Sequence, residues 1–213
     1  MKLIEASLLA FSKCPFKFYL ELLSLKRSDI FNIHYDVMDN KFVNNTAFFG
    51  EKLSFITKRK FDVSVHLMVF DVDYYVDFFL KYKIKYLTFH CEVIDTKHSI
   101  EIINKIKDEG IKAGIAIKPN TNIYDYKELI SHCDIITVMG VEPGFGGQKY
   151  IKEVTKKLCD LKKIIPSNCL IQLDGGVNLE VIKETKNYID LFVSGSFLMK
   201  SKEKYKIKEF VES

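Results

Sequence analysis

The sequence predicts an α/β protein that forms a single (β/α)8 barrel, the TIM-barrel architecture. The first observation is that short apolar runs alternate with longer amphipathic runs eight times along the 213 residues. Such alternation is typical of a parallel sheet covered by helices, and eight units in a compact chain favour closure into a barrel. The second observation is that polar residues and glycines follow several of the strands, where barrels gather their active sites. An open, doubly wound sheet is the structural alternative. No Gly-x-Gly-x-x-Gly motif follows the first strand, so dinucleotide binding has no support.

The predicted strands are short runs that are rich in β-branched and aromatic residues. We place them at residues 3–9, 30–37, 61–69, 86–91, 113–117, 135–139, 170–173 and 191–193. The predicted helices lie at residues 16–25, 51–57, 72–82, 99–109, 125–132, 151–164, 179–185 and 202–211. Thr96 and Asn178 can cap helix starts, and Gly110 can close a helix. No linker or break in composition divides the chain, so we expect one domain over residues 1–213.

Composition narrows the classes of protein to consider. Hydrophobic residues make up 47% of the chain, enough for a sizeable core, but no apolar run reaches the roughly 18–20 residues of a membrane span. The start of the sequence, residues 1–5, carries the carboxylate of Glu5 where a signal peptide would need apolar residues, so no targeting segment is expected. Five scattered cysteines without a Cys-x-x-Cys pair fit reduced thiols and a cytoplasmic protein. The formal charge of +4 is spread along the chain, which fits an anionic substrate and does not indicate nucleic acid or a membrane as a partner.

Polar side chains at the ends of three predicted strands are candidate ligands of a metal ion. Side chains alternate faces along a strand, so His34 and Asp36 share one side of the second strand. This spacing suits metal binding or acid/base chemistry, although the polar side of an edge strand would show the same pattern. His66 ends the third strand and Asp174 the seventh. If the strands close into a barrel, these four side chains can converge on one divalent cation.

Glycine-rich turns after the last two strands are candidate anion sites. Gly175 and Gly176 precede one predicted helix, and Gly195 with Ser196 precedes the final helical segment. Backbone N–H groups at such turns can bind a phosphate without a lysine side chain. In barrels the loops after strands seven and eight are the usual phosphate site.

A further glycine-rich loop follows the sixth strand. Gly144, Phe145, Gly146 and Gly147 have little side-chain bulk apart from the phenyl ring. This loop could fold over a ligand as a lid, or it could be an ordinary mobile turn. We favour the lid because the loop follows a strand that ends in the same cluster.

Seven segments, in the right order and spread over essentially the whole chain, resemble motifs of the ribulose-phosphate 3-epimerase family. They are Ser7-Leu8-Leu9, residues 34–39, residues 65–69, residues 88–90, Val138-Met139 with residues 142–148, residues 174–177, and Ser194-Gly195-Ser196.

The resemblance implies a set of site residues. Ser7, His34 and His66 would contact the substrate, while Asp36 and Asp174 would be the two proton-transfer groups. His34, Asp36, His66 and Asp174 would hold one divalent ion per chain, Zn²⁺ or Fe²⁺ foremost, with Mn²⁺ or Co²⁺ as further options. The remaining substrate contacts would come from the loop residues Gly144, Phe145, Gly146, Gly147, Gly175, Gly176, Gly195 and Ser196.

The implied reaction explains why these residue types are required at the site. Inverting a carbon beside a ketone requires one group to remove a proton from one face and another to return a proton to the opposite face. A metal ion can stabilise the negative charge that develops on the substrate oxygens. Met38, Met68 and Met139 would line the pocket with unreactive, polarizable side chains, or would simply fill the barrel core.

The expected function is therefore 3-epimerisation of D-ribulose 5-phosphate to D-xylulose 5-phosphate in the pentose-phosphate pathway. One alternative is a related epimerase of a longer ketose phosphate such as D-allulose 6-phosphate. Another alternative is a phosphate-binding barrel without catalytic activity, but such a barrel has no need for Asp36 and Asp174 together. We expect a small phosphorylated ketose as the substrate and self-association into a homo-oligomer.

Overall fold

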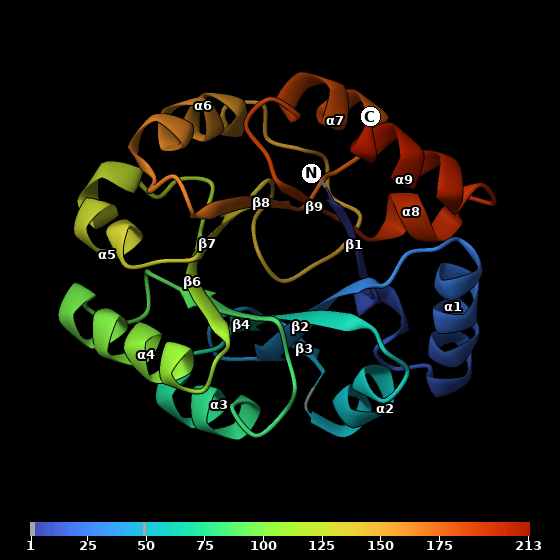
Figure 1. Ribbon diagram of the computed structural model, residues 1–213, viewed down its shortest axis with the longest axis horizontal. Coiled ribbons are helices and arrows are strands. Elements are labelled where there is room, and N and C mark those ends of the chain that lie inside the picture. Colours follow the sequence, from blue (N-terminus) through green and yellow to red (C-terminus); the bar gives the residue numbers. More distant parts are fainter. Residues whose placement is uncertain (1–2, 49) are drawn as a thin grey trace.

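The computed structural model describes residues 3–48 and 50–213, and these residues form a closed barrel of parallel strands surrounded by helices (Figure 1). The strands are β1 (Leu3–Ser7), β2 (Asn32–Asp39), β3 (Thr46–Ala47), β4 (Asp62–Met68), β5 (Tyr86–His90), β6 (Lys112–Ile117), β7 (Ile135–Met139), β8 (Leu170–Asp174) and β9 (Leu191–Ser194). Their order in the sheet is β1-β9-β8-β7-β6-β5-β4-β2-β3, and only the short β3 pairs in the antiparallel sense. β1 pairs in parallel with both β9 and β2, and these two pairings close the barrel. The predicted (β/α)8 barrel is confirmed.

Helices follow the strands and cover the outside of the barrel. They are α1 (Pro15–Arg27), α2 (Leu53–Thr57), α3 (Val72–Phe79), α4 (Thr96–Asp108), α5 (Lys127–Ser131), α6 (Val154–Ile164), α7 (Leu179–Thr185), α8 (Ser196–Lys200) and α9 (Lys204–Glu212). Asn178 caps α7 as predicted, since its side chain accepts a hydrogen bond from the backbone N–H of Val181. The prediction for Thr96 was wrong by one residue, because the Asp95 side chain caps α4.

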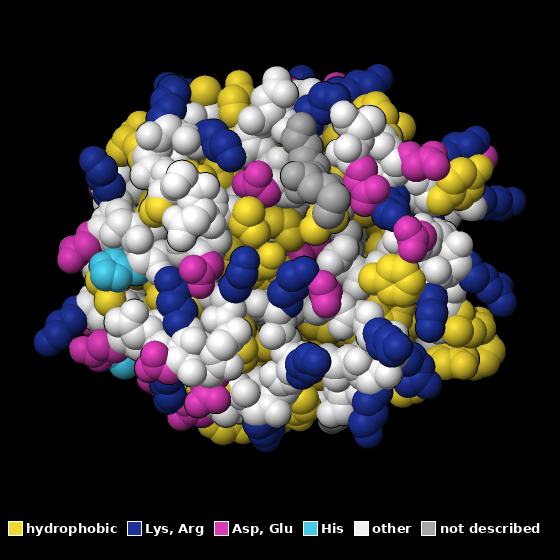
Figure 2. All heavy atoms as spheres, in the orientation of Figure 1, with side chains coloured by type: hydrophobic (Ala, Val, Ile, Leu, Met, Phe, Trp, Pro, Cys, Tyr) yellow, Lys and Arg dark blue, Asp and Glu magenta, His cyan; other side chains and the backbone are white. Residues whose placement is uncertain are grey.

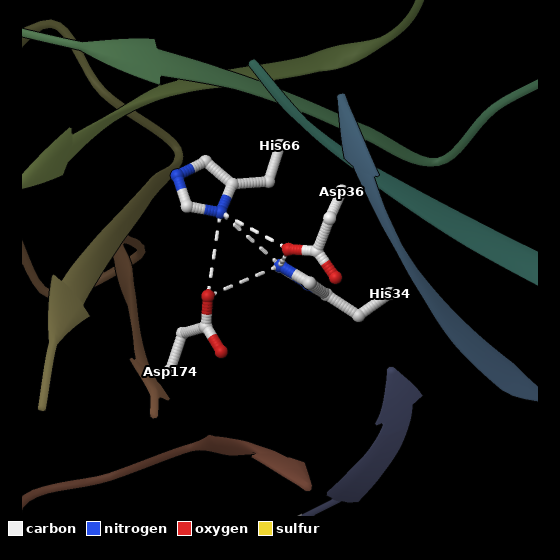
Figure 3. A group of neighbouring side chains, drawn as sticks. All are labelled: His34, Asp36, His66 and Asp174. Carbon is white, nitrogen blue, oxygen red and sulfur yellow. Dashed lines mark hydrogen bonds and ion pairs between the residues drawn. The ribbon is translucent and has the colours of Figure 1, made fainter. Parts of the chain in front are cut away.

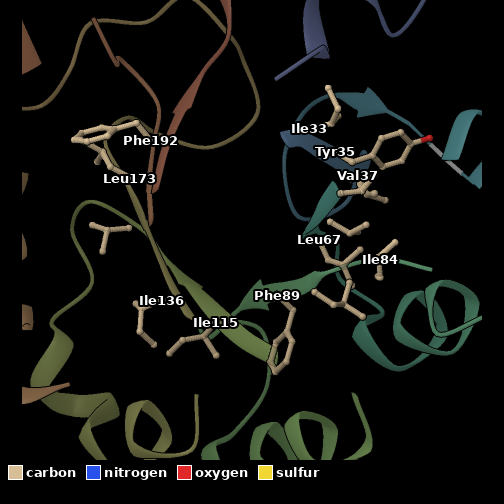
Figure 4. Close-up of a cluster of buried hydrophobic side chains, with 14 of the residues drawn as sticks. Ile33, Tyr35, Val37, Leu67, Ile84, Phe89, Ile115, Ile136, Leu173 and Phe192 are labelled. Carbon is tan, nitrogen blue, oxygen red and sulfur yellow. The ribbon is translucent and has the colours of Figure 1, made fainter. Parts of the chain in front are cut away.

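The outer sides of the strands form the main hydrophobic core. In β2, Ile33, Tyr35 and Val37 are fully buried in this core, which also holds Phe89 of β5 and Phe192 of β9 (Figure 4). Because side chains alternate along a strand, the intervening residues of β2 point into the barrel. Helix packing on one side therefore fixes which polar side chains meet on the other.

The interior of the barrel is layered. At the end where the strands begin, Tyr86, Ile135 and Leu191 form a small apolar cluster. The next inward-facing positions include the buried polar residues Glu5 and Gln172. The candidate metal ligands come after this polar layer, toward the carboxyl ends of the strands.

The structure differs from the predicted elements at several chain segments. β1 ends at Ser7 rather than residue 9, and a short 3-10 helix follows at Leu9–Phe11. The two-residue strand β3 and the five-residue helix α8 were not predicted, since neither is long enough to show a periodic pattern. Met1 and Lys2, on which the expectation about a targeting segment partly rests, lie outside the described residues.

Charged side chains of both signs are spread around the face shown in Figure 2, with Lys and Arg beside Asp and Glu. Among the described helices, none combines the length and apolar character that crossing a bilayer would require.

Candidate active site and metal centre

Three strands bring the predicted ligands together inside the barrel. His34 and Asp36 project inward from β2, His66 from β4 and Asp174 from the end of β8. The parallel register places Asp36 opposite His66, and Asp174 opposite Met139 of β7. The two histidines are fully buried, while Asp36 and Asp174 retain 3% and 9% exposure.

The nitrogen and oxygen atoms of this cluster lie at short, nearly equal separations (Figure 3). His34 Nε2 is 3.3 Å from His66 Nδ1, and it is 3.5 Å from both Asp36 Oδ1 and Asp174 Oδ2. His66 Nδ1 is 3.7 Å from Asp36 Oδ1 and 3.3 Å from Asp174 Oδ2. Asp36 and Asp174 approach the two nitrogens from different sides in Figure 3.

These separations fit a divalent cation. Zinc–nitrogen and zinc–oxygen bonds of about 2.0–2.1 Å in a tetrahedron place neighbouring donor atoms roughly 3.3 Å apart. Each of the four residues offers one donor atom, and all four donors lie within 4.8 Å of one another. Two neutral imidazoles and two carboxylates also balance a charge of +2. The cluster could therefore hold one divalent metal ion.

Electrostatics within the cluster also favour a cation. Burial alone would lower the pKa of His34, but the carboxylates of Asp36 and Asp174 outweigh burial and raise it well above its ordinary value. The pKa of His66 is also raised, because hydrogen bonds to the same carboxylates outweigh burial. Burial opposes ionisation of Asp36 and Asp174, yet the histidines hold the pKa of each carboxyl below its usual range. The cluster thus keeps two negative charges and attracts positive charge.

Ser7 fixes the orientation of one candidate ligand. Its hydroxyl donates a 2.7 Å hydrogen bond to Asp36 Oδ2, which leaves Asp36 Oδ1 directed at the two histidines. Ser7 also lines the pocket that opens above the cluster.

His90, at the end of β5, lies directly behind His66. Its Nδ1 is 3.1 Å from Glu92 Oε2, and its Nε2 is 3.1 Å from His66 Nε2. Burial opposes ionisation of Glu92, but its carboxylate accepts hydrogen bonds from His90, Thr121 and the backbone N–H of Lys118, and these lower its pKa to about 2. Burial lowers the pKa of His90 to about 4. Ionised Glu92 can only accept a hydrogen bond, so neutral His90 donates from Nδ1 and accepts at Nε2. His66 then donates from Nε2 and directs the lone pair of Nδ1 toward the cluster.

Above the cluster opens a pocket of about 710 Å³. Asp36 and Asp174 line it, whereas His34 and His66 lie fully buried below. The pocket is also lined by the predicted loop residues Gly144, Phe145, Gly146, Gly147, Gly175, Gly176, Gly195 and Ser196 and by the predicted methionines Met38, Met68 and Met139. Met38 and Met68 are buried together in one small apolar cluster, so they both line the pocket and fill the barrel.

Two lysines in the pocket wall were not predicted. Lys13 follows the 3-10 turn after β1, and Lys200 ends α8. Both side chains line the pocket. Lysines are numerous in this chain, and nothing in their local sequence distinguished these two.

The glycine-rich loop after β7 lies against the segment between β2 and β3. Asn45 Nδ2 donates a 2.6 Å hydrogen bond to the backbone oxygen of Gly144. Gln148 holds the loop from within, because its side chain donates to the backbone oxygens of Glu142 and Phe145. Phe145 is 57% exposed and lies at the pocket rim. The loop is therefore in place over one side of the pocket, which is compatible with the predicted lid.

Comparison with known proteins agrees with this geometry. Residues 3–199 match the model of the ribulose-phosphate 3 epimerase family. A ribulose-phosphate 3-epimerase of Mycoplasma genitalium is 38% identical over 169 residues, which cover 79% of each chain. One from Helicobacter pylori is 33% identical over 189 residues, which cover 86% of this chain and 85% of the relative.

Solved structures support the fold. A mutant tryptophan synthase alpha-subunit from Pyrococcus furiosus superimposes with a TM-score of 0.70 over 99% of this chain and 96% of its own, at 16% sequence identity. That level of identity bears on the barrel architecture alone. The family match and the relatives from two bacteria carry the assignment: this chain is an isomerase that belongs to the ribulose-phosphate 3-epimerase family.

Proposed function

We propose that this protein interconverts D-ribulose 5-phosphate and D-xylulose 5-phosphate by moving a proton at C3. The observation that carries the proposal is the pair of carboxylates, Asp36 and Asp174, which line one pocket and reach the same two histidines from different strands. The names of the relatives support the choice of substrate.

In this proposal the two aspartates share the proton transfer. One carboxylate removes the C3 proton from one face of the sugar, and the other carboxyl group returns a proton to the opposite face. The pKa values of Asp36 and Asp174 are both lowered in the free protein, which suits a base but not yet an acid. We therefore expect the difference in protonation between them to arise in the substrate complex.

His34, Asp36, His66 and Asp174 would hold the divalent ion, which we expect to be Zn²⁺ or Fe²⁺. When bound, the ion would supply Lewis-acid stabilisation of negative charge on the substrate oxygens. Ser7 would keep Asp36 oriented, since its hydroxyl already bonds the outer oxygen of that carboxylate.

The phosphate would bind in the same pocket, among the glycine turns after β8 and β9. Gly175 and Gly176 have φ values of +101° and +70°, a backbone conformation that favours glycine. Their N–H groups, with those of Gly195 and Ser196, are the candidate anion donors. Closure of the Gly144–Gly147 loop would then exclude water from the sugar.

The test is an epimerisation assay in D₂O with protein purified without chelator. We expect turnover of D-ribulose 5-phosphate and deuterium at C3 of the product, because a two-base exchange brings the incoming proton from solvent. D-Allulose 6-phosphate, assayed in parallel, tests the longer substrate. Return of the original hydrogen to C3 without deuterium label in a single turnover would contradict the two-base assignment. If neither sugar is converted, the proposed function is wrong.

Self-association and a cytoplasmic location stay predictions. Light scattering on the purified protein measures the first. The five unpaired cysteines support the second, because they fit a reducing compartment.

A further inference from the structure

A buried carboxylate lies behind His34, on the side away from the pocket. Glu5 of β1 is 2% exposed, and its side chain projects into the barrel interior. No motif drew attention to this residue. Burying a carboxylate among strands is costly relative to an apolar side chain, so packing alone does not account for it.

Three side chains from three other strands direct polar groups at Glu5. Ser64 Oγ donates to Glu5 Oε1 at 2.7 Å, and Gln172 Nε2 donates to Glu5 Oε2 at 2.8 Å. His34 Nδ1 lies 3.3 Å from the same Oε2 atom. Thr137 Oγ1 donates to Gln172 Oε1 at 2.7 Å, which turns the amide nitrogen of Gln172 toward Glu5. Both oxygens of Glu5 thus serve as acceptors.

This arrangement selects one form of the His34 ring. A carboxylate accepts hydrogen bonds, so the contact with Glu5 requires a proton on His34 Nδ1. In a neutral imidazole the lone pair then resides on Nε2, and Nε2 is the atom that faces Asp36, His66 and Asp174. The other neutral form would present an N–H group to the site and could not bind a cation there.

We propose that Glu5 is a positioning residue that holds His34 in the tautomer able to bind the metal ion. The inference rests on the metal centre proposed above. Partners of this kind orient ligand histidines, and their loss typically weakens metal affinity by roughly 10–100-fold.

Three variants separate positioning from a structural role. Glu5→Met keeps the bulk and removes the acceptor. Glu5→Gln keeps an acceptor oxygen for His34 and Gln172, and its amide can donate to Ser64 if that hydroxyl rotates. Thr137→Val is the matched control, because it alters the same buried polar network without touching His34. The probe is zinc alone, measured as its Kd by competition with a chromophoric chelator and by imidazole ¹⁵N–¹H NMR of the zinc-loaded protein.

For Glu5→Met we expect the Kd for zinc to rise roughly 10–100-fold. We expect Glu5→Gln to recover most of that loss and Thr137→Val to leave the Kd unchanged. The NMR spectrum of the zinc-loaded parent should show His34 protonated at Nδ1. If Glu5→Met does not fold, the parent spectrum decides alone.

Two results would overturn the inference while leaving the proposed metal centre intact. One is a Glu5→Met protein that binds zinc as tightly as the parent. The other is a parent spectrum in which Nδ1 of His34 carries no proton. A parent protein that binds no zinc would overturn the metal centre itself and this inference with it.

Discussion

Replacing Gly176 with alanine should damage both stability and substrate binding. Gly176 has a φ of +70°, and a Cβ atom added there would lie 2.6 Å from both Cα and N of Tyr150. Ordinary carbon contacts are about 3.5–4.0 Å, so the Tyr150 backbone would have to move by about 1 Å. That backbone is tied down at the next residue, where Ile151 N–H donates to the Gly140 oxygen at 2.9 Å.

The expected loss follows from these two features. A residue with a side chain in the left-handed conformation costs about 1–2 kcal/mol. Losing the Ile151–Gly140 hydrogen bond adds about 1 kcal/mol. We therefore expect Gly176→Ala to lower the free energy of unfolding by about 2–3 kcal/mol. The KM for D-ribulose 5-phosphate should rise as well, because the same shift displaces the proposed phosphate donors.

Urea unfolding and steady-state kinetics test this expectation, with Gly146→Ala as the matched control. Gly146 also lines the pocket, but a Cβ atom added there meets nothing within 4 Å. Gly146→Ala should therefore unfold like the parent. If Gly176→Ala proves as stable as Gly146→Ala, the close approach of Gly176 to Tyr150 does not constrain this turn and the reasoning fails.

Three further predictions concern the cluster and its surroundings. His66→Ala should strip the metal ion, and metal analysis that finds about one divalent ion per chain in both parent and variant would remove His66 from the ligand set. Asp36→Asn and Asp174→Asn should each lower the epimerisation rate by ~10²–10⁴, measured with metal content checked in each variant, and a rate close to the parent's would exclude that residue from proton transfer. In chelator-treated protein, burial lowers the pKa of His90 from 6.5 to about 4, so the unfolded chain binds the extra proton first as the pH falls. The contribution of neutral His90 to stability should then decline by on the order of 3 kcal/mol from pH 6.5 to 4. The difference in unfolding free energy between the parent and His90→Asn should therefore become smaller over that pH range. A constant difference would show that His90 is not buried in its neutral form.

The four candidate ligands were predicted from the period-2 pattern of one strand, from the positions of His66 and Asp174 at strand ends, and from the family resemblance. His34 and Asp36 had to share a face of β2, and closure of the barrel brings that face toward His66 and Asp174. The outer face of the same strand, with Ile33 and Tyr35, had to pack under helices. These features depend on local spacing and on the topology of the barrel, which the alternation of runs already indicates.

The residues that support the candidate ligands and the glycine-rich loop could not be predicted in this way. Glu5 meets Gln172 across 167 positions of the sequence, and neither residue belongs to a recognisable motif. The role of His90 depends on the side-chain direction of Glu92, which strand periodicity does not determine. Asn45 reaches the glycine loop from a segment whose two-residue strand is too short to show a pattern.

Closure of the sheet between β1 and β9 has a consequence for how the candidate metal site forms during folding. Three of the four candidate ligands, His34, Asp36 and His66, lie close together in the sequence, whereas Asp174 and β9 come much later along the chain. Until β9 pairs with β1, the barrel is open and His34 cannot be held opposite Asp174. A chain that stops before β8 should therefore bind a divalent ion poorly, because the full set of candidate ligands comes together only when β8 and β9 have joined the sheet.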